Sequence, residues 1–231
     1  MNSKLSDLFP SAKPGRHVTG EDTRARLIAA ATEVFLEDGY KSARVQDIAE
    51  RAGQRLSAIN YHFEGKEGLY HAVLRHHADK ALNDVPLLPL DPLLPLRTRF
   101  DFAVAALVNR MLNDRGPSRI GQLMMRALMN PGPILDVLIE HFSLPQANKL
   151  MELLAEIVGP AVPREALSRC LISIFGQCVV HMAGRPMIDR VAPEIFTGDD
   201  VLARIAEHIS EFSWAGLMAV RRQWEVHDAQ D

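Results

Sequence analysis

Cysteine is nearly absent from this sequence of 231 residues, which contains two. Cys170 and Cys178 lie eight positions apart in a helical pattern, so they would be roughly 12 Å apart along one helix. A disulfide cannot bridge that distance. We interpret both as small buried hydrophobic residues, with a redox-sensing pair as the alternative.

Long apolar runs are also missing. No run approaches the ~20 residues needed to span a bilayer. The first residues, MNSKLSDLFPSAKPGRHVTG, lack the apolar segment of a secretory signal. We therefore expect a cytoplasmic protein with no membrane partner.

The motifs of the common enzyme classes are lacking. The sequence has no nucleophile elbow, no paired zinc-ligand motif, no Walker loop and no GxGxxG fingerprint. His71, His76 and His77 share one helical stretch, but no carboxylate or cysteine accompanies them at metal-ligand spacing. These absences predict a protein that is not an enzyme and that needs neither cofactor nor metal.

Alternating strand patterns and internal repeats do not occur either. With 47% hydrophobic residues the chain can build the core of one or two domains, and its periodic stretches have helical spacing, which predicts an all-α fold. In the carboxyl-terminal part we expect helices over these ranges: Arg97 to Asn113, Ser118 to Asn130, Ile134 to Val158 with a bend near Pro145, Pro163 to Ala183, and Asp199 to about His227.

An excess of positive charge is the last absence. The formal net charge of −3 argues against a protein that coats nucleic acid indiscriminately. It does not exclude a sequence-specific binder, because only the face on the DNA must be basic. The amino-terminal arm carries Lys4, Lys13, Arg16 and His17. A solvated tail is its simplest interpretation, with DNA contact by its last residues as an added role.

A helix-turn-helix pattern is present from Arg44 to Phe63. Apolar residues recur at helical spacing on both sides of Gly53, which suits a sharp turn. These sets can meet in a small core: Val45, Ile48 and Ala49 before the turn, and Leu56, Ile59 and Phe63 after it. The opposite face of the second helix would then enter a major groove. On these residues alone, a helical hairpin that only packs is the alternative.

The motifs around this segment resemble the TetR family of bacterial transcriptional regulators. An amphipathic helix, Arg24 to Glu37, ends in Asp-Gly-Tyr; DIAERAG, a Tyr-His-Phe triplet and Lys-Glu-x-Leu follow. The stretches AINYHFEGKEGLY, LMMRALMNPGP and GQC resemble the CecR-like branch of that family. The resemblance implies a three-helix DNA-binding domain followed by a helical ligand-binding and dimerisation domain.

The expected organisation has five parts. A flexible arm at 1–19 precedes the DNA-binding domain at 20–66, and a connecting helix at 67–84 leads into the body at 97–231. Between the last two lies the stretch at 85–96, whose prolines exclude regular helix and central strand. We expect it to be a fixed connector packed along the surface.

Residues of two kinds are expected on DNA: those that contact bases and those that contact phosphates. Arg55 stands where the family usually has a capping Ser or Asn, and an arginine there is well placed to bind guanine O6 and N7. By resemblance, the Tyr61 hydroxyl holds a phosphate; the Lys66 ammonium and the helix amides beside it are placed to hold another. His62 is expected to be structural. The complete set of predicted DNA-binding residues is Arg16, Arg44, Gln46, Arg55, Ser57, Ala58, Asn60, Tyr61 and Lys66.

The last two long helices are apolar around much of their circumference, so each must bury a second face against something. By resemblance that partner is the same helix pair of a second subunit, whereas helices that are simply central in a monomer are the alternative. The predicted dimer-interface residues are Phe175, Gly176, Ile209, Phe212 and Gly216.

Methionines concentrate in the body, where they suit a pliable apolar pocket but also serve as ordinary core residues. We expect a largely apolar cavity in which Arg126, Gln177 and His181 orient the polar part of an effector. The predicted ligand-binding residues are Gln122, Met125, Arg126, Met129, Phe142, Gln177 and His181.

These patterns predict a homodimeric repressor that binds double-stranded operator DNA and is released by a small hydrophobic effector. By resemblance, its target genes would serve export or detoxification. An activator, or a DNA-binding protein without small-molecule control, is the alternative; an enzyme is the more distant one.

Overall fold

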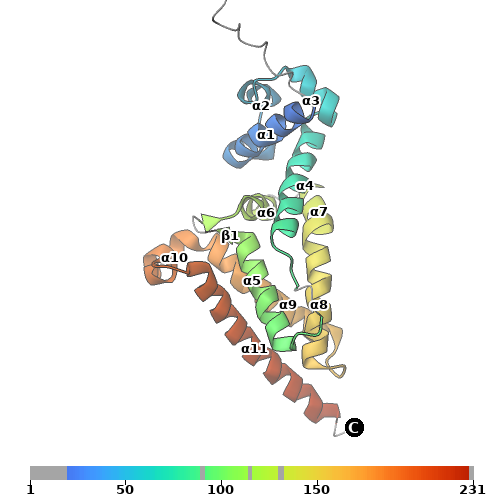
Figure 1. The fold of residues 1–231 in the computed structure, drawn as a ribbon, viewed down its shortest axis with the longest axis vertical. Helices are drawn as coiled ribbons and strands as arrows, with labels where there is room; N and C mark the ends of the chain where they lie inside the picture. The colour runs from blue at the N-terminus through green and yellow to red at the C-terminus, as the bar shows by residue number, and fades with distance from the viewer. Residues whose placement is uncertain (1–19, 89–91, 114–115, 130–132, 229–231) are drawn as a thin grey trace, which may run out of the picture.

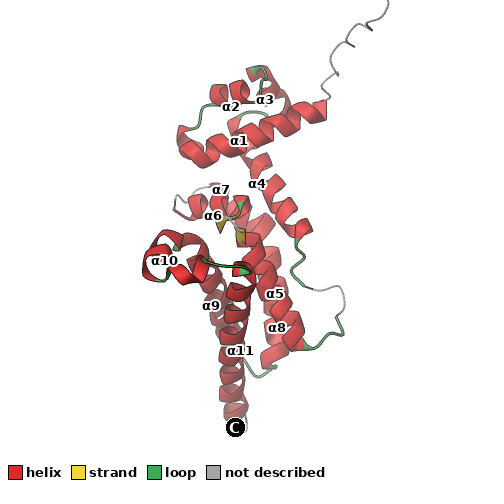
Figure 2. Cartoon of the chain, turned by 60° about the vertical axis from the view of Figure 1, so that its left-hand side comes forward, coloured by secondary structure: helices red, strands yellow, loops and turns green. Residues whose placement is uncertain are grey.

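The computed structural model of the chain describes residues 20–88, 92–113, 116–129 and 133–228. Helices dominate it, which confirms the all-α prediction. A small head formed by the first three helices lies at one end, and the last helix runs to the other end (Figures 1 and 2). One helix, α4 (Lys66–Asp84), leads from the head into the body.

The head consists of α1 (Gly20–Ser42), α2 (Val45–Arg51) and α3 (Leu56–Phe63). As predicted, α1 is interrupted at Gly39, whose φ of 77° lies in the left-handed region that favours glycine. Its buried stripe contains Leu27 and Phe35, which meet Ile48 and Ile59 in one core. The Phe35 ring packs edge-on against the ring of Tyr70 on α4, with centroids 4.5 Å apart.

The head core continues into the body. Besides the head helices and α4, the same hydrophobic cluster contains residues of α6 (Arg119–Met129) and α7 (Pro133–Leu138). Phe142, on the π-helical turn Ile139–Ser143, belongs to it as well. The body therefore packs against the head through α4 on a shared apolar surface.

A second cluster forms the core of the body. Its main helices are α5 (Leu96–Met111), α8 (Leu144–Val158), α9 (Arg164–Ala183) and α11 (Val201–Asp228). Short elements complete the body: strands β1 (Leu112–Asn113) and β2 (Gly116–Pro117), which pair antiparallel, the helix α10 (Arg185–Val191) and a 3-10 turn (Pro193–Phe196).

The helix expected from Ile134 to Val158 with a bend near Pro145 is found as α7, the π-helical turn and α8, and the π-helical turn ends two residues before Pro145. Other elements differ from the sequence prediction. The short strands and α10 were not expected, because two paired residues or seven helical ones are too short to leave a periodic pattern.

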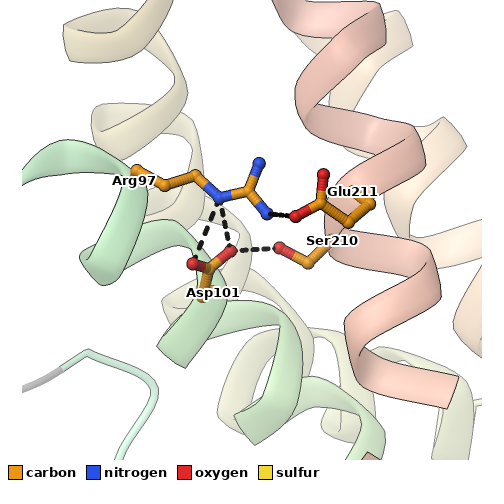
Figure 3. Close-up of polar contacts among 4 residues, drawn as sticks. All are labelled: Arg97, Asp101, Ser210 and Glu211. Atoms are coloured by element: carbon orange, nitrogen blue, oxygen red, sulfur yellow. Dashed lines mark hydrogen bonds and ion pairs between the residues drawn. The ribbon is translucent and has the colours of Figure 1, made fainter. Parts of the chain in front are cut away.

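Polar contacts fasten α11 to α5 near the start of α5 (Figure 3). The Arg97 Nε donates to both carboxylate oxygens of Asp101, at 2.8 and 3.1 Å, and its Nη2 donates to Glu211 at 2.5 Å. The buried hydroxyl of Ser210 donates to Asp101 at 2.5 Å. The Arg97 guanidinium also lies over the Trp214 ring. This network fixes the register of the two helices.

A buried arginine anchors the end of α4. Arg110 on α5 donates through Nε and Nη2 to the Val85 carbonyl, at 2.8 and 2.5 Å, and through Nη1 to the Gln146 side chain. Burial lowers the pKa of Arg110 to about 10. The adjacent connector carries Leu87 into the body core, as its apolar composition predicts. Its residues 89–91 lie outside the described ranges.

Candidate nucleic-acid interface

The turn between α2 and α3 sets the position of the recognition helix. The Gly53 N–H donates to the Glu50 carbonyl, and the Gln54 N–H donates to the Ala49 carbonyl. This pair of bonds is a Schellman motif, which requires a left-handed residue at its centre. Gly53 supplies it with a φ of 61°. A larger residue there would strain the turn and displace α3.

The outer face of α3 is polar and uncovered. Ile59 and Phe63 are buried in the head core, whereas Ser57, Asn60 and Tyr61 are exposed. The Tyr61 side chain is 85% exposed, and its ring lies edge-on to the His62 ring with centroids 4.9 Å apart. The groups expected from the sequence on this face are therefore brought together on the surface.

One core prediction is wrong. Leu56 was expected in the head core, but it is 41% exposed and begins α3 beside the exposed Arg55 and Ser57. Its helical spacing agreed with Ile59, yet the first turn of a helix has no preceding turn to cover it. Burial at this position therefore cannot be inferred from periodicity alone.

Arginines occupy both N-cap positions, Arg44 before α2 and Arg55 before α3. Neither helix has a side-chain cap, and the sequence anticipated this from the loss of Ser or Asn. Both arginines are exposed, as is Gln46 one turn into α2. Their positive charge and the free helix amides favour a negatively charged partner at this surface.

A shallow depression adjoins the turn. It is lined by Gly53, Gln54, Arg55, Ser57, Ala58 and Tyr61. Its lining combines a guanidinium, an amide and two hydroxyl groups, which can donate to phosphate oxygens and base edges. Ala58 thus lies beside the predicted DNA-binding residues on this face.

Lys66 is more constrained than the sequence suggested. Its Nζ donates to the Lys41 carbonyl at 3.1 Å and lies 4.9 Å from the centre of the Tyr40 ring. Partial burial lowers the pKa of Lys66. Two of its three N–H donors remain for a phosphate. Arg16, the remaining predicted contact, lies outside the described residues.

The predicted effector residues do not converge on one cavity. Arg126 on α6 turns toward the head, where its Nη2 donates to the carbonyl groups of Leu36 and Glu37, the latter at 3.0 Å. Met129 is 74% exposed, and Phe142 is buried in the core shared with the head. The single pocket expected around these residues is therefore not present in this arrangement.

The remaining effector candidates are divided between two places. Gln122 and Met125 are half-buried on α6, where Met125 packs against the body core. On α9, the Gln177 Nε2 donates to the Ser213 hydroxyl at 3.0 Å, and His181 Nδ1 lies 2.8 Å from the Gln177 carbonyl. These α9 groups have partners inside the chain, which reduces the polar capacity left for a ligand.

A mainly apolar hollow lies elsewhere, between α9 and α11, with a volume of about 390 Å³. Its lining includes Cys170, Gln177, Phe212 and Trp224. Burial raises the pKa of the Cys170 thiol, and it raises that of Cys178 to about 12. Thiols held protonated in this way are poor redox groups, which favours the interpretation of both as packing residues.

The dimer prediction is partly corrected. Ile209 has 0% exposure and packs in the body core, so it cannot contact a second subunit. On the outer side of the same helices Phe212 is 67% and Ile172 is 68% exposed, and Phe175 is half-buried. A Cβ built on Gly176 or Gly216 would meet nothing within 4 Å, so this face is open.

By length and composition α9 could cross a membrane, contrary to the expectation that no segment would, and 28% of its apolar window is buried. It is the one described helix that meets this criterion. Among the residues that the structure describes, no three His, Cys, Asp or Glu side chains form a group that could hold a metal ion.

The contact between α6 and α1 was not predicted. Besides Arg126, Arg119 reaches α1 through an ion pair with Glu33 at 2.7 Å. The two arginines are seven residues apart, two helical turns, and so lie on one side of α6. That spacing was visible in the sequence, but the partner helix was not.

Two family models match the chain. The model of bacterial regulatory proteins of the tetR family matches residues 27–73, and the model of the carboxyl-terminal domain of the transcriptional dual regulator CecR matches residues 96–217. The first covers most of the head and α4, and the second covers the body through most of α11.

Individual relatives are regulators by name. The chain is 38% identical over 71 residues to the transcriptional activator FasR of Mycolicibacterium smegmatis, covering 31% of this chain and 32% of FasR. It is 42% identical over 66 residues to the dual regulator CecR of Shigella flexneri, covering 29% of each. Against the regulator SrpR of Pseudomonas putida it is 27% identical over 148 residues, 64% of each protein. The matches thus span from under a third to just under two thirds of these relatives.

Solved structures share the fold. A transcriptional regulator from Rhodococcus sp. RHA1 superposes with a TM-score of 0.61 at 20% identity, over 85% of this chain and 96% of that one. HlyIIR, a hemolysin II transcriptional regulator, does so with a TM-score of 0.54 at 19% identity, over 83% and 99%. These likenesses agree on a helix-turn-helix head joined to a helical body.

Proposed function

Since the chain belongs to the TetR family of DNA-binding transcriptional regulators, in its CecR-like branch, we propose that it is a ligand-responsive repressor that binds a palindromic operator as a homodimer. The observation that carries this proposal is the presence, in one chain, of an uncovered polar recognition face on α3 and an uncovered apolar face on α9 and α11. The first needs DNA and the second needs a protein partner.

The polar face supports sequence-specific binding. Arg55 and Asn60 offer groups that pair with guanine and adenine edges, whereas Arg44, Tyr61 and Lys66 are placed for phosphates. Arg16 belongs to the proposal as a contact from the arm. Two heads held about one helical turn of DNA apart would read successive major grooves. The protein works in the cytoplasm in this proposal, where the chromosome lies.

The apolar face supports a symmetric dimer. Phe175, Gly176, Phe212 and Gly216 remain proposed interface residues, joined by Ile172. A two-fold axis beside α9 and α11 would pair each helix with its copy, so that one patch covers itself. The hollow at Phe212 and Trp224 would then receive side chains of the second subunit.

Effector control is proposed to act through α6. Met125 on this helix packs against the body core, where a small hydrophobic effector would bind, whereas Arg119 and Arg126 hold α1. Gln122, which lies between the two arginines along the helix, remains a proposed effector contact. A ligand that shifts α6 would move the head directly as well as through α4. An effector that prefers the shifted state by about 3 kcal/mol changes the population more than tenfold. The controlled genes are proposed to serve export or detoxification.

The test combines DNA binding with mass measurement. The purified chain is titrated onto duplexes from the region upstream of its own gene and its neighbours, and stoichiometry is measured by mass photometry or sedimentation. The proposal expects two protomers on a palindromic fragment and release by a hydrophobic compound that also raises the thermal unfolding midpoint. Indifference to every fragment would overturn it.

Activation is the second candidate. It is favoured by the names of two relatives, the activator FasR and the dual regulator CecR. The same head would serve both roles, so an in vitro transcription assay on the bound fragment decides between them. No enzymatic role enters the proposal, because the relatives are named as regulators.

A further inference from the structure

Leu56, the first residue of α3, has an apolar side chain that is 41% exposed. Among the described residues of the head, it and Tyr61 are the large apolar or aromatic side chains with high exposure. Burying a leucine side chain stabilises a fold by about 1.5–3 kcal/mol, and the head core directly beneath is already filled by Ile59 and Phe63, at 1% and 6% exposure. Part of the Leu56 side chain is therefore not covered by other residues of the chain.

Its neighbours are groups that bind nucleic acid bases. Arg55 precedes it at the N-cap and Ser57 follows it, both exposed. Asn60 lies four residues further, on the same side of α3 and about 6 Å along the axis. An apolar group within such a surface matches one feature of the major groove, the C5-methyl group of thymine, which polar side chains do not recognise.

We propose that Leu56 is a specificity-determining residue that reads the 5-methyl group of a thymine in each half-site. Asn60, one turn away, would read a neighbouring adenine through N6 and N7. The inference rests on the proposed function, because it requires that α3 enter the major groove. It makes recognition at one base pair depend on a methyl group rather than on a hydrogen bond.

Replacing thymine by deoxyuridine removes the methyl group and leaves every hydrogen-bonding group in place. On a duplex that the wild-type chain binds, each thymine of one half-site is replaced in turn. We expect one position where the change weakens binding about 4-fold, the effect of exposing one methyl-sized group. In Leu56→Ala, thymine and deoxyuridine at that position should bind equally, whereas Leu56→Met should retain the preference.

Leu144→Ala is the matched control, because Leu144 is also a leucine near the start of a helix, is 47% exposed and lies in the body. It should discriminate as the wild type does. Circular dichroism confirms that each variant is folded. The inference is overturned if the wild type is indifferent to every deoxyuridine substitution, or if Leu56→Ala keeps the discrimination. A chain that binds no duplex would instead remove the proposed function, and those two failures are distinguishable.

Discussion

At the scale of single residues, the proposed function assigns two kinds of DNA contact to the head. Tyr61 on α3 and Lys66 at the start of α4 would contact phosphates, which every sequence has, whereas Asn60 on α3 would contact base edges. A phosphate contact adds affinity and salt dependence; a base contact adds discrimination.

The first prediction contrasts these roles. Tyr61→Phe should weaken binding uniformly across sequences, because it removes the hydroxyl group proposed to contact a phosphate. The side chain is 85% exposed, so its loss of the hydroxyl group should not disturb the fold. Asn60→Ala should relax preference at particular base pairs, at a cost of about 1–3 kcal/mol on the best site. Binding to a randomised library, measured at two salt concentrations, checks both. Unchanged affinity and preference in Asn60→Ala would mean that α3 is oriented otherwise.

The second prediction concerns His77 on α4. The Thr32 hydroxyl donates to the Ile28 carbonyl at 2.8 Å, so its oxygen accepts from His77 Nε2, 3.0 Å away. Burial, with the charges of His76, Arg119 and Lys80 nearby, lowers the pKa of His77 to about 4. In the folded state His77 therefore stays neutral down to about pH 4, whereas in the unfolded state it is protonated near its ordinary pKa of 6.5.

The sign follows from this shift. Stability from neutral His77 is complete above about pH 6.5 and is lost as pH falls toward 4. Between pH 7 and 5 we expect the free energy of unfolding to fall by about 1 kcal/mol from this group, allowing for its partial exposure. Urea denaturation at both pH values measures it. His77→Gln should show a smaller fall; an equal fall would assign the effect to other groups.

At the scale of elements, α6 is a helix of the body that contacts the head directly. It reaches α1 by the Arg119–Glu33 ion pair and by the Arg126 bonds to the last carbonyls before Gly39. Because those carbonyl groups lie just before the interruption of α1 at Gly39, Arg126 also stabilises the part of α1 that leads to α2.

The third prediction removes this contact. Arg126→Ala should lower the free energy of unfolding by about 1 kcal/mol, since the partly buried Leu36 carbonyl loses a charged donor, and should speed amide exchange in Gly39 to Ala43. Arg169→Ala is the control, because its pair with Glu165 is largely exposed, and should change stability by less than about 0.5 kcal/mol. Denaturation and hydrogen exchange measure both. Equal effects would show that Arg126 does not couple the two parts.

The elements also show how far sequence reasoning reaches. Periodicity and turn chemistry predicted the head, because Gly39, Gly53 and the apolar spacing act locally. They failed for Leu56 at a helix start and for Ile209, whose helix is apolar on two sides. The side of α6 that faces the head could not be predicted, because it depends on packing between distant segments. Arg126 was assigned to a pocket that it turns away from.

At the scale of the whole molecule, the open apolar face is the surface on which the proposed dimer depends. The fourth prediction places a charge on it: Phe212→Glu should give a folded monomer, because a carboxylate cannot be buried unpaired in an apolar interface. Loss of two-headed binding should reduce operator affinity about 100-fold or more. Sedimentation and mobility shift measure these effects.

Leu93→Glu is its control. Leu93 is 90% exposed on the connector, away from the proposed interface, and the variant should remain dimeric and bind DNA as the wild type does. A Phe212→Glu protein that stays dimeric would move the interface to another surface.

The anchoring of α4 at Val85 has a mechanical consequence. Arg110 holds that end in the body, while the other end, 19 residues away, carries the head. The helix is thus a lever arm of about 28 Å with its fulcrum at the guanidinium. A tilt of about 5° would swing the head by about 2.5 Å, and in a symmetric pair the two swings add. A sub-ångström shift of α4 near Val85 would thereby change the separation of the two heads enough that they no longer fit successive major grooves of DNA.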